Sequence, residues 1–236
     1  MSGCFYVTYA WDARGAGFAN TVTDGQWELF HQRLSYAAQA FQNGWTLDPS
    51  DSAAPRNMLS VVMGESMGED AANACFKRAV MAEPENLFNY DQRLNMLLPR
   101  WGGSRERVLE LGRQCLKKAQ ADKGKFGHLA RVLIAGHCSL SDEWDWNRPK
   151  NGYWLQDDVW PDLDAAFKVI LELNPHSREY RTQYAYKAWR CHQWQTAQEQ
   201  FKKLGDKPLY AMFGGEAGYK SAVEEVDDKL KHQDKF

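Results

Sequence analysis

A recurring frame of three landmarks constrains this chain most strongly: a small or aliphatic residue, a phenylalanine four positions later, and a proline seven or eight positions further on. The frame occurs as Ala37-x3-Phe41 with Pro49, Ala72-x3-Phe76 with Pro84, Leu163-x3-Phe167 with Pro175, and Ala197-x3-Phe201 with Pro208. Residues four apart share one face of a helix. Proline ends a helix because it lacks an amide hydrogen and disfavours helical backbone before it. Each frame therefore predicts a helix that buries its phenylalanine and stops near the proline.

The spacing of these frames predicts how the helices pack. Successive phenylalanines are 35, 91 and 34 residues apart, and two of these distances match the period of about 34 residues of tetratricopeptide repeats. A helical hairpin leaves an apolar face that only its neighbour covers, so hairpins stack. We expect an all-α, tetratricopeptide-like solenoid of antiparallel helical hairpins. It forms a single repeat domain over residues 1–236, with an irregular Trp-rich insertion at 139–160.

Helical spacing of apolar residues recurs along the chain, whereas β-branched alternating stretches are scarce. Thr23 and Gln26 have the spacing of a capping box at the start of one helix. The expected helices span 5–14, 24–46, 55–66, 69–82, 86–98, 104–121, 125–138, 161–173, 177–190, 193–204 and 216–231.

Charge and cysteine usage exclude several classes of protein. The 29 Lys and Arg residues face 31 Asp and Glu residues, so the chain lacks the basic excess of a nucleic-acid-binding protein. No run of eighteen apolar residues predicts a membrane span. Five scattered cysteines without a CxxC pair indicate a reducing, cytoplasmic location. Ser2-Gly3-Cys4 is similar to the end of a lipoprotein cleavage site, so a lipoprotein or periplasmic location is expected only for a truncated chain.

Two stretches go beyond generic repeat spacing: Tyr9-Ala10-Trp11-Asp12-Ala13-Arg14-Gly15 and Pro99-Arg100-Trp101-Gly102-Gly103. Together they resemble a bacterial domain-of-unknown-function family that is itself similar to tetratricopeptide-repeat proteins. The resemblance implies a helical-repeat fold in a bacterial or phage protein. It carries no catalytic residues over to this chain.

The sequence gives little support for catalysis. None of the six histidines pairs with another at i+3 or i+4, and HExxH and the phosphate-binding loop do not occur. We therefore expect no catalytic residue, no metal site and no cofactor. The segment Gly64-Glu65-Ser66-Met67-Gly68 matches GxSxG, but it follows a predicted helix and not a strand, so we predict that it is a hairpin turn and not a nucleophile elbow.

Tryptophans crowd the predicted insertion. Trp144, Trp146, Trp154 and Trp160 fall within 17 residues, with Asp145 between the first two. Large aromatic side chains in loops anchor binding partners, which makes Trp144, Asp145, Trp146 and Trp154 candidate binding residues. The alternative is that these rings plug the groove of a degenerate repeat from within.

A second candidate group combines Trp11 with Arg14, and Arg100 with Trp101. An arginine stacked on tryptophan can anchor an anion or a partner. The alternative is that each arginine bonds the carbonyls of a helix end and holds a glycine turn.

These observations favour a non-catalytic protein that binds another protein or a peptide, such as a toxin antagonist, an immunity protein or an adaptor. The alternative is an enzyme or small-ligand sensor whose pocket is formed by residues 139–160. A homo-oligomeric scaffold is a third candidate.

Overall fold

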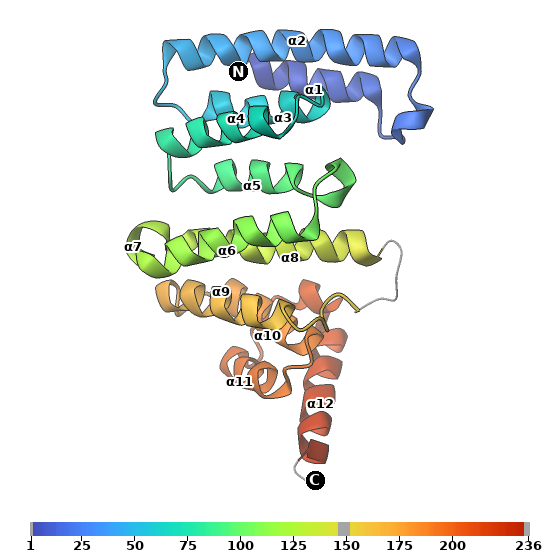
Figure 1. The fold of residues 1–236 in the computed structure, drawn as a ribbon. Helices are drawn as coiled ribbons and strands as arrows, with labels where there is room; N and C mark the ends of the chain where they lie inside the picture. The colour runs from blue at the N-terminus through green and yellow to red at the C-terminus, as the bar shows by residue number, and fades with distance from the viewer. Residues whose placement is uncertain (1, 146–151, 234–236) are drawn as a thin grey trace. The chain divides into compact units, whose positions relative to one another are not determined.

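The computed structural model describes residues 2–145 and 152–233, and this part of the chain is helical without any strand (Figure 1). The prediction of an all-α protein is confirmed. Within the same residues, no helix combines the length and the apolar character needed to cross a membrane. The chain divides into two compact units, Met1–Arg105 and Glu106–Phe236, which are described separately below.

The first unit consists of five α-helices and two short 3-10 turns among its described residues. They are α1 (Ser2–Arg14), η1 (Ala19–Thr21), α2 (Asp24–Leu47), α3 (Ala53–Gly64), α4 (Glu69–Ala82), α5 (Leu87–Met96) and η2 (Pro99–Trp101). The long helix α2 packs along α1, as Figure 1 shows at the blue end of the chain. Its buried face is formed by Phe30, Leu34, Ala37 and Phe41, which follow the predicted helical spacing.

Local sequence signals explain where α2 starts and why α1 lies close to it. The predicted capping box is confirmed: Thr23 accepts a hydrogen bond from the Gln26 backbone, and the Gln26 side chain accepts one from the Thr23 backbone. Gly3 in α1 meets the Phe41 ring so closely that a Cβ atom there would lie 2.5 Å from the ring. The absence of a side chain at position 3 thus lets the two helices approach.

The predicted turn at 64–68 is also confirmed. Helix α3 ends at Gly64, and α4 starts at Glu69. Between them, Ser66 and Gly68 both have positive φ angles, of 52° and 86°. No strand precedes the serine in the described part of the chain, so the geometry of a nucleophile elbow is missing here.

The second unit begins within α6 (Arg105–Ala121), at Glu106, and continues with helices that pack in sequence order. They are α7 (Lys123–Phe126), η3 (Gly127–Leu129), α8 (Ala130–Asp145), α9 (Val159–Leu173), α10 (Arg178–Arg190), α11 (Trp194–Leu204), η4 (Tyr210–Phe213) and α12 (Glu216–Gln233). Helix α9 packs on α8 and α10, and α11 packs on α10 and α12. The core at the end of this unit contains Ala188, Ala197, Phe201 and Val226.

The four copies of the recurring frame each lie on a helix that ends shortly before the proline of its frame. Phe41, Phe167 and Phe201 are buried, and Phe76 is half-buried against the cluster around Leu59. The helices that carry them end at Leu47, Ala82, Leu173 and Leu204, each two to four residues before the proline of its frame.

The predicted boundaries of the insertion are wrong at both ends. Helix α8 continues to Asp145, because Leu140 and Ser141 extend its buried face beyond the predicted end at residue 138. Helix α9 already starts at Val159, which is fully buried. Between these helices, the described residues 152–158 form consecutive turns.

Candidate functional site

The first unit brings together two tryptophans that lie ninety residues apart in the sequence. The rings of Trp11 and Trp101 meet edge-on, with their centres 5.6 Å apart. Arg14 lies 5.5 Å from the centre of the Trp11 ring and 5.4 Å from that of Trp27. It also donates to the carbonyls of Gly15 at 3.1 Å and Gly17 at 2.9 Å. Arg14 thus both stacks on tryptophan and holds the end of α1, as the two alternatives predicted separately.

The segment around Arg100 forms the turn that ends α5. The Arg100 guanidinium donates to the Asn95 side chain at 3.3 Å. Gly102 has a φ angle of 82°, and a Cβ atom on Gly103 would lie 1.9 Å from the Leu97 carbonyl oxygen. The two glycines are therefore required by the backbone itself. Trp101 remains partly exposed beside Trp11.

An exposed group of aromatic rings lies on α1 and α2 that was not predicted from the sequence. The rings of Phe5 and Tyr9 stack with centres 5.6 Å apart, and Tyr6 contacts Phe5 at 5.5 Å and Tyr36 at 5.4 Å. The Arg33 guanidinium lies 3.3 Å from the centre of the Tyr9 ring. We call these five side chains the aromatic–arginine surface. The i, i+4 spacing of Phe5 and Tyr9 was the available signal, but the pairing with Tyr36 depends on how α1 meets α2.

Two candidate residues of the Trp-rich segment, Trp144 and Trp154, lie beside Tyr153 in the second unit. The Tyr153 ring contacts Trp144 at 6.0 Å and Trp154 at 5.3 Å, both edge-on. Trp154 is only 4% exposed, so it presents almost no surface to an outside partner. Asp145 is the last residue of α8, and Trp146 lies outside the described residues. The packing of Trp154 agrees with the alternative in which these rings fill the groove of a degenerate repeat from within.

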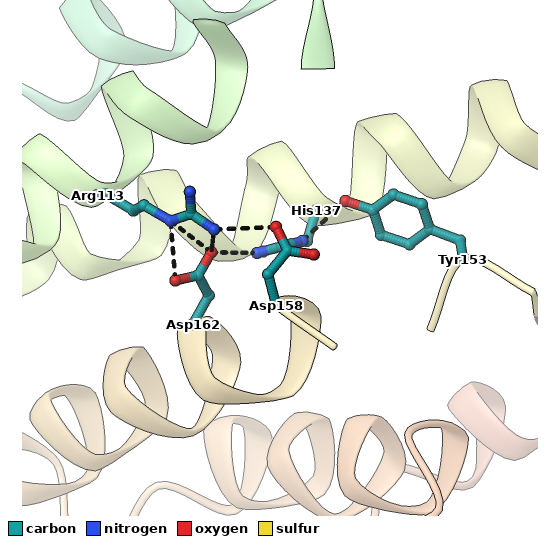
Figure 2. A network of polar contacts seen from close by, with 5 residues as sticks. All are labelled: Arg113, His137, Tyr153, Asp158 and Asp162. Atoms are coloured by element: carbon teal, nitrogen blue, oxygen red, sulfur yellow. Dashed lines mark hydrogen bonds and ion pairs between the residues drawn. The ribbon is translucent and has the colours of Figure 1, made fainter. Parts of the chain in front are cut away.

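A buried polar network underlies the same segment (Figure 2). His137 on α8 is fully buried, with Nδ1 2.8 Å from the Tyr153 hydroxyl and Nε2 3.1 Å from Asp162 Oδ2. Arg113 on α6 donates from Nε to both oxygens of Asp162, at 3.1 and 3.0 Å. Its Nη2 lies 2.8 Å from Asp162 Oδ2 and 3.0 Å from Asp158 Oδ2. The network therefore ties residues 153–162 to α6 and α8.

The charges of this network stabilise one another. Burial opposes ionisation of Asp162, but the hydrogen bonds from His137 and Arg113 outweigh it, and the pKa of Asp162 lies below its ordinary value. The hydrogen bond to Asp162 likewise raises the pKa of Arg113. An ionised carboxylate only accepts, so Nε2 of the imidazole donates to Asp162. In the neutral ring, Nδ1 then accepts from Tyr153.

A histidine held by a carboxylate is also the arrangement of a general base. A base must reach the proton that it removes, whereas both nitrogens of His137 are engaged inside the protein and its ring has no exposed surface. The geometry fits a positioning role for the network. No group of three His, Cys, Asp or Glu side chains that could hold a metal ion occurs among residues 2–145 and 152–233.

His137, Asp158 and Asp162 were not among the candidate residues named from the sequence. The available signal was a histidine within the apolar face of a helix, where a buried imidazole needs polar partners. Those partners come from 16 and 25 residues further along the chain. Their identity therefore required the fold.

Comparison of the chain with protein-family models, with curated proteins and with solved structures finds no match. The resemblance to a tetratricopeptide-like family of unknown function thus stays a prediction, and functional arguments for this protein rest on its own geometry.

Proposed function

We propose that this protein is a tetratricopeptide-like helical-repeat protein that binds a protein partner through the aromatic–arginine surface of α1 and α2. The repeat part of the proposal is supported by pairs of consecutive helices that pack together: α1 with α2, α3 with α4, α8 with α9, and α10 with α11. The second helix of each pair carries one copy of the recurring frame. This is the order expected if each frame closes one helical hairpin.

The observation that carries the binding proposal is the exposure of adjoining aromatic rings. Phe5 is 61% exposed, Tyr9 42% and Tyr36 47%, and Tyr6 bridges them by ring contacts. Exposed apolar side chains are common singly, but contiguous groups mark interaction sites. Tyrosine and arginine are also the residue types that dominate binding energy at protein interfaces.

The chemistry of Arg33 indicates what the partner presents. Its guanidinium rests on the Tyr9 ring and donates to the Tyr9 carbonyl at 2.6 Å. Within the described residues it forms no ion pair. A guanidinium that lacks a carboxylate and rests on the Tyr9 ring fits a protein segment that places an acidic side chain beside apolar ones. Such docking suits an adaptor, or an antagonist that sequesters a toxin, and needs no catalytic group.

The Trp-rich segment favours this function over an enzyme or sensor with a pocket formed by residues 139–160. Tyr153 is 1% exposed and Trp154 4% exposed, so these rings fill the interior of the segment. The carboxylates beside them, Asp158 and Asp162, bind Arg113. Neither feature leaves a group aimed at a substrate.

The test compares three forms of the protein as bait in a lysate of its native host. The surface variant carries Phe5→Ser and Tyr36→Ser. The control carries Leu47→Ser and Phe88→Ser, which remove exposed apolar side chains elsewhere in the first unit. Each captured protein is then purified, and its affinity for all three forms is measured by calorimetry.

We expect the wild type and the control to bind the same partner equally, and the surface variant to bind it at least about tenfold more weakly. Circular dichroism verifies that the three forms are equally helical. The proposal is wrong if every purified partner binds the surface variant as tightly as the wild type, or if the wild type captures none.

A further inference from the structure

The second unit contains a cavity of about 370 Å³ beside α10, η4 and α12. Three aromatic side chains line it, Tyr186, Trp189 and Phe213, together with the charged side chains of Arg190 and Glu225. The Tyr186 and Phe213 rings meet edge-on with centres 5.2 Å apart, which gives the cavity a rigid aromatic wall. Its volume falls within the range of small-molecule sites.

Arg190 enters this cavity without an anion. Its Nη1 donates to the Tyr186 hydroxyl at 2.8 Å, and its Nε is buried without a hydrogen-bond partner in the described structure. It forms no ion pair with any described residue, although Glu225 lines the same cavity. Glu225 instead accepts a hydrogen bond from Trp189 Nε1 at 2.9 Å. A buried, unsatisfied donor on a charged group calls for an explanation.

A second cation lies behind Arg190, one helical turn earlier. The Lys187 ammonium is buried, 3.7 Å from the centre of the Trp154 ring, and Arg190 lies 5.8 Å from the same ring. No described carboxylate pairs with Lys187. The adjacent thiol does not supply the missing charge either, because burial raises the pKa of Cys191 to about 12, although both cations oppose this. The two cations thus share an aromatic ring and lack a counter-charge.

The backbone next to the cavity is strained as well. Residue 192, just after helix α10, has a left-handed backbone conformation with a φ angle of 57°. This residue is a histidine, although glycine is the usual residue in that conformation after a helix. His192 lines the cavity, and its ring stacks on Trp194 with centres 4.7 Å apart. Strain of this kind concentrates where a side chain is needed for binding.

We propose that this cavity binds a small aromatic carboxylate, with the carboxylate on Arg190 and the ring against Trp189 and Phe213. Arginine donates to both oxygens of a carboxylate from its planar fork, and Arg190 lines the cavity without forming an ion pair with any described residue. The aromatic wall buries the ring of the ligand. The site is separate from the aromatic–arginine surface, so its test does not depend on the proposed protein partner.

The test is calorimetric titration of the full chain with indole-3-acetate and phenylacetate, using indole-3-acetamide and inorganic phosphate as comparison probes. We expect saturable binding of one or both aromatic carboxylates at millimolar concentration or below. The amide keeps the ring but has no charge, and phosphate keeps a charge but has no ring. Each should bind at least about tenfold more weakly.

Three variants identify the site. Arg190→Gln should weaken binding at least about tenfold, whereas Arg178→Gln, which removes an exposed arginine from the other end of α10, should leave it unchanged. Glu225→Gln retains an acceptor for Trp189 but removes the one acidic side chain among the described residues that line the cavity, and should tighten binding severalfold. This gain would not arise from a merely structural role, and it keeps the proposal testable if Arg190→Gln fails to fold.

The proposal is overturned if neither aromatic carboxylate binds, or if the acetate and the amide bind equally. It is also overturned if Glu225→Gln weakens binding, since an acidic residue that aids the ligand would mean that the ligand is not an anion.

Discussion

His137 on α8 and Asp162 on α9 face each other across the interior of the second unit, with Nε2 and Oδ2 3.1 Å apart. The same carboxylate receives Arg113 from α6. One acidic side chain thus satisfies a buried imidazole and a guanidinium from two different helices. Because a buried polar group without a partner is costly, loss of the Asp162 carboxylate should weaken the packing of these three helices.

We expect Asp162→Asn to lower the free energy of unfolding by about 1.5–3 kcal/mol at neutral pH, the range for hydrogen bonds to charged groups. The pKa of Asp162 is lowered in the folded protein, so its contribution is present above the ordinary value of about 3.9 and is lost as the pH falls through the lower folded value. The difference between wild type and variant should therefore shrink in acid. Urea unfolding over a pH series measures it.

Asp157→Asn is the matched control for this prediction, because Asp157 is exposed and only one residue from the network. It should change stability by less than about 0.5 kcal/mol. An equal loss in both variants, or a difference that does not depend on pH, would contradict the assigned role of Asp162.

Two glycine-to-alanine substitutions should have opposite effects. In α6, a Cβ atom on Gly112 would lie 2.8 Å from Leu133 Cα and 2.7 Å from Leu133 Cδ1, so the backbones must separate. Overpacking costs about 1–3 kcal/mol, which exceeds the gain of up to about 1 kcal/mol in helix propensity. In α2, a Cβ atom on Gly25 meets nothing within 4 Å. At that position only the gain in helix propensity remains, which is about 0.5–1 kcal/mol.

Thermal melts of both glycine variants test this contrast. Gly112→Ala should melt below the wild type and Gly25→Ala above it. If Gly112→Ala melts at or above the wild-type temperature, α6 and α8 are not in the close contact described here.

The sequence predicted the helices well because their signals are local. Thr23 with Gln26 marks the start of α2, and the prolines at 49, 84, 175 and 208 mark helix ends, since capping and proline geometry act within a few residues. The end of α8 was misplaced because burial of Leu140 depends on tertiary packing, which overrides local composition.

The candidate sites were predicted less completely, because each joins segments that are distant in the sequence. Trp11 and Trp101 were both named from the sequence, but their contact was not. The pairing of Tyr6 with Tyr36 and of His137 with Asp162 likewise depends on how helices pack. Periodicity shows that one face of a helix is buried, but it does not identify the side chain on the opposite helix.

Cysteine reactivity should follow burial. Cys4 is exposed, whereas Cys75, Cys115 and Cys191 are buried, and burial raises the pKa of both Cys75 and Cys191. Since the thiolate is the reactive form, iodoacetamide at pH ~8 should modify Cys4 at least about tenfold faster than the three buried cysteines. Peptide mass spectrometry over a time course measures the rates, with urea-unfolded protein as the control. Equal rates in the folded protein would show that these thiols are not protected.

Removing the capping box should destabilise the first unit by about 1 kcal/mol. Thr23→Ala leaves the backbone N–H of Gln26 without its acceptor and removes the hydroxyl that donates to Gln26 Oε1 at 3.0 Å, whereas the backbone N–H of residue 23 keeps its bond to that oxygen. Thr46→Ala is the control at the other end of the same helix, where the hydroxyl donates only to the Gln42 carbonyl at 2.9 Å. Because alanine is the better helix former, Thr46→Ala should leave the free energy of unfolding unchanged or raise it slightly. Urea unfolding of Thr23→Ala, Gln26→Ala and the double variant completes the test. The bond between the two side chains is lost in both single variants, so their losses should sum to more than the loss in the double variant.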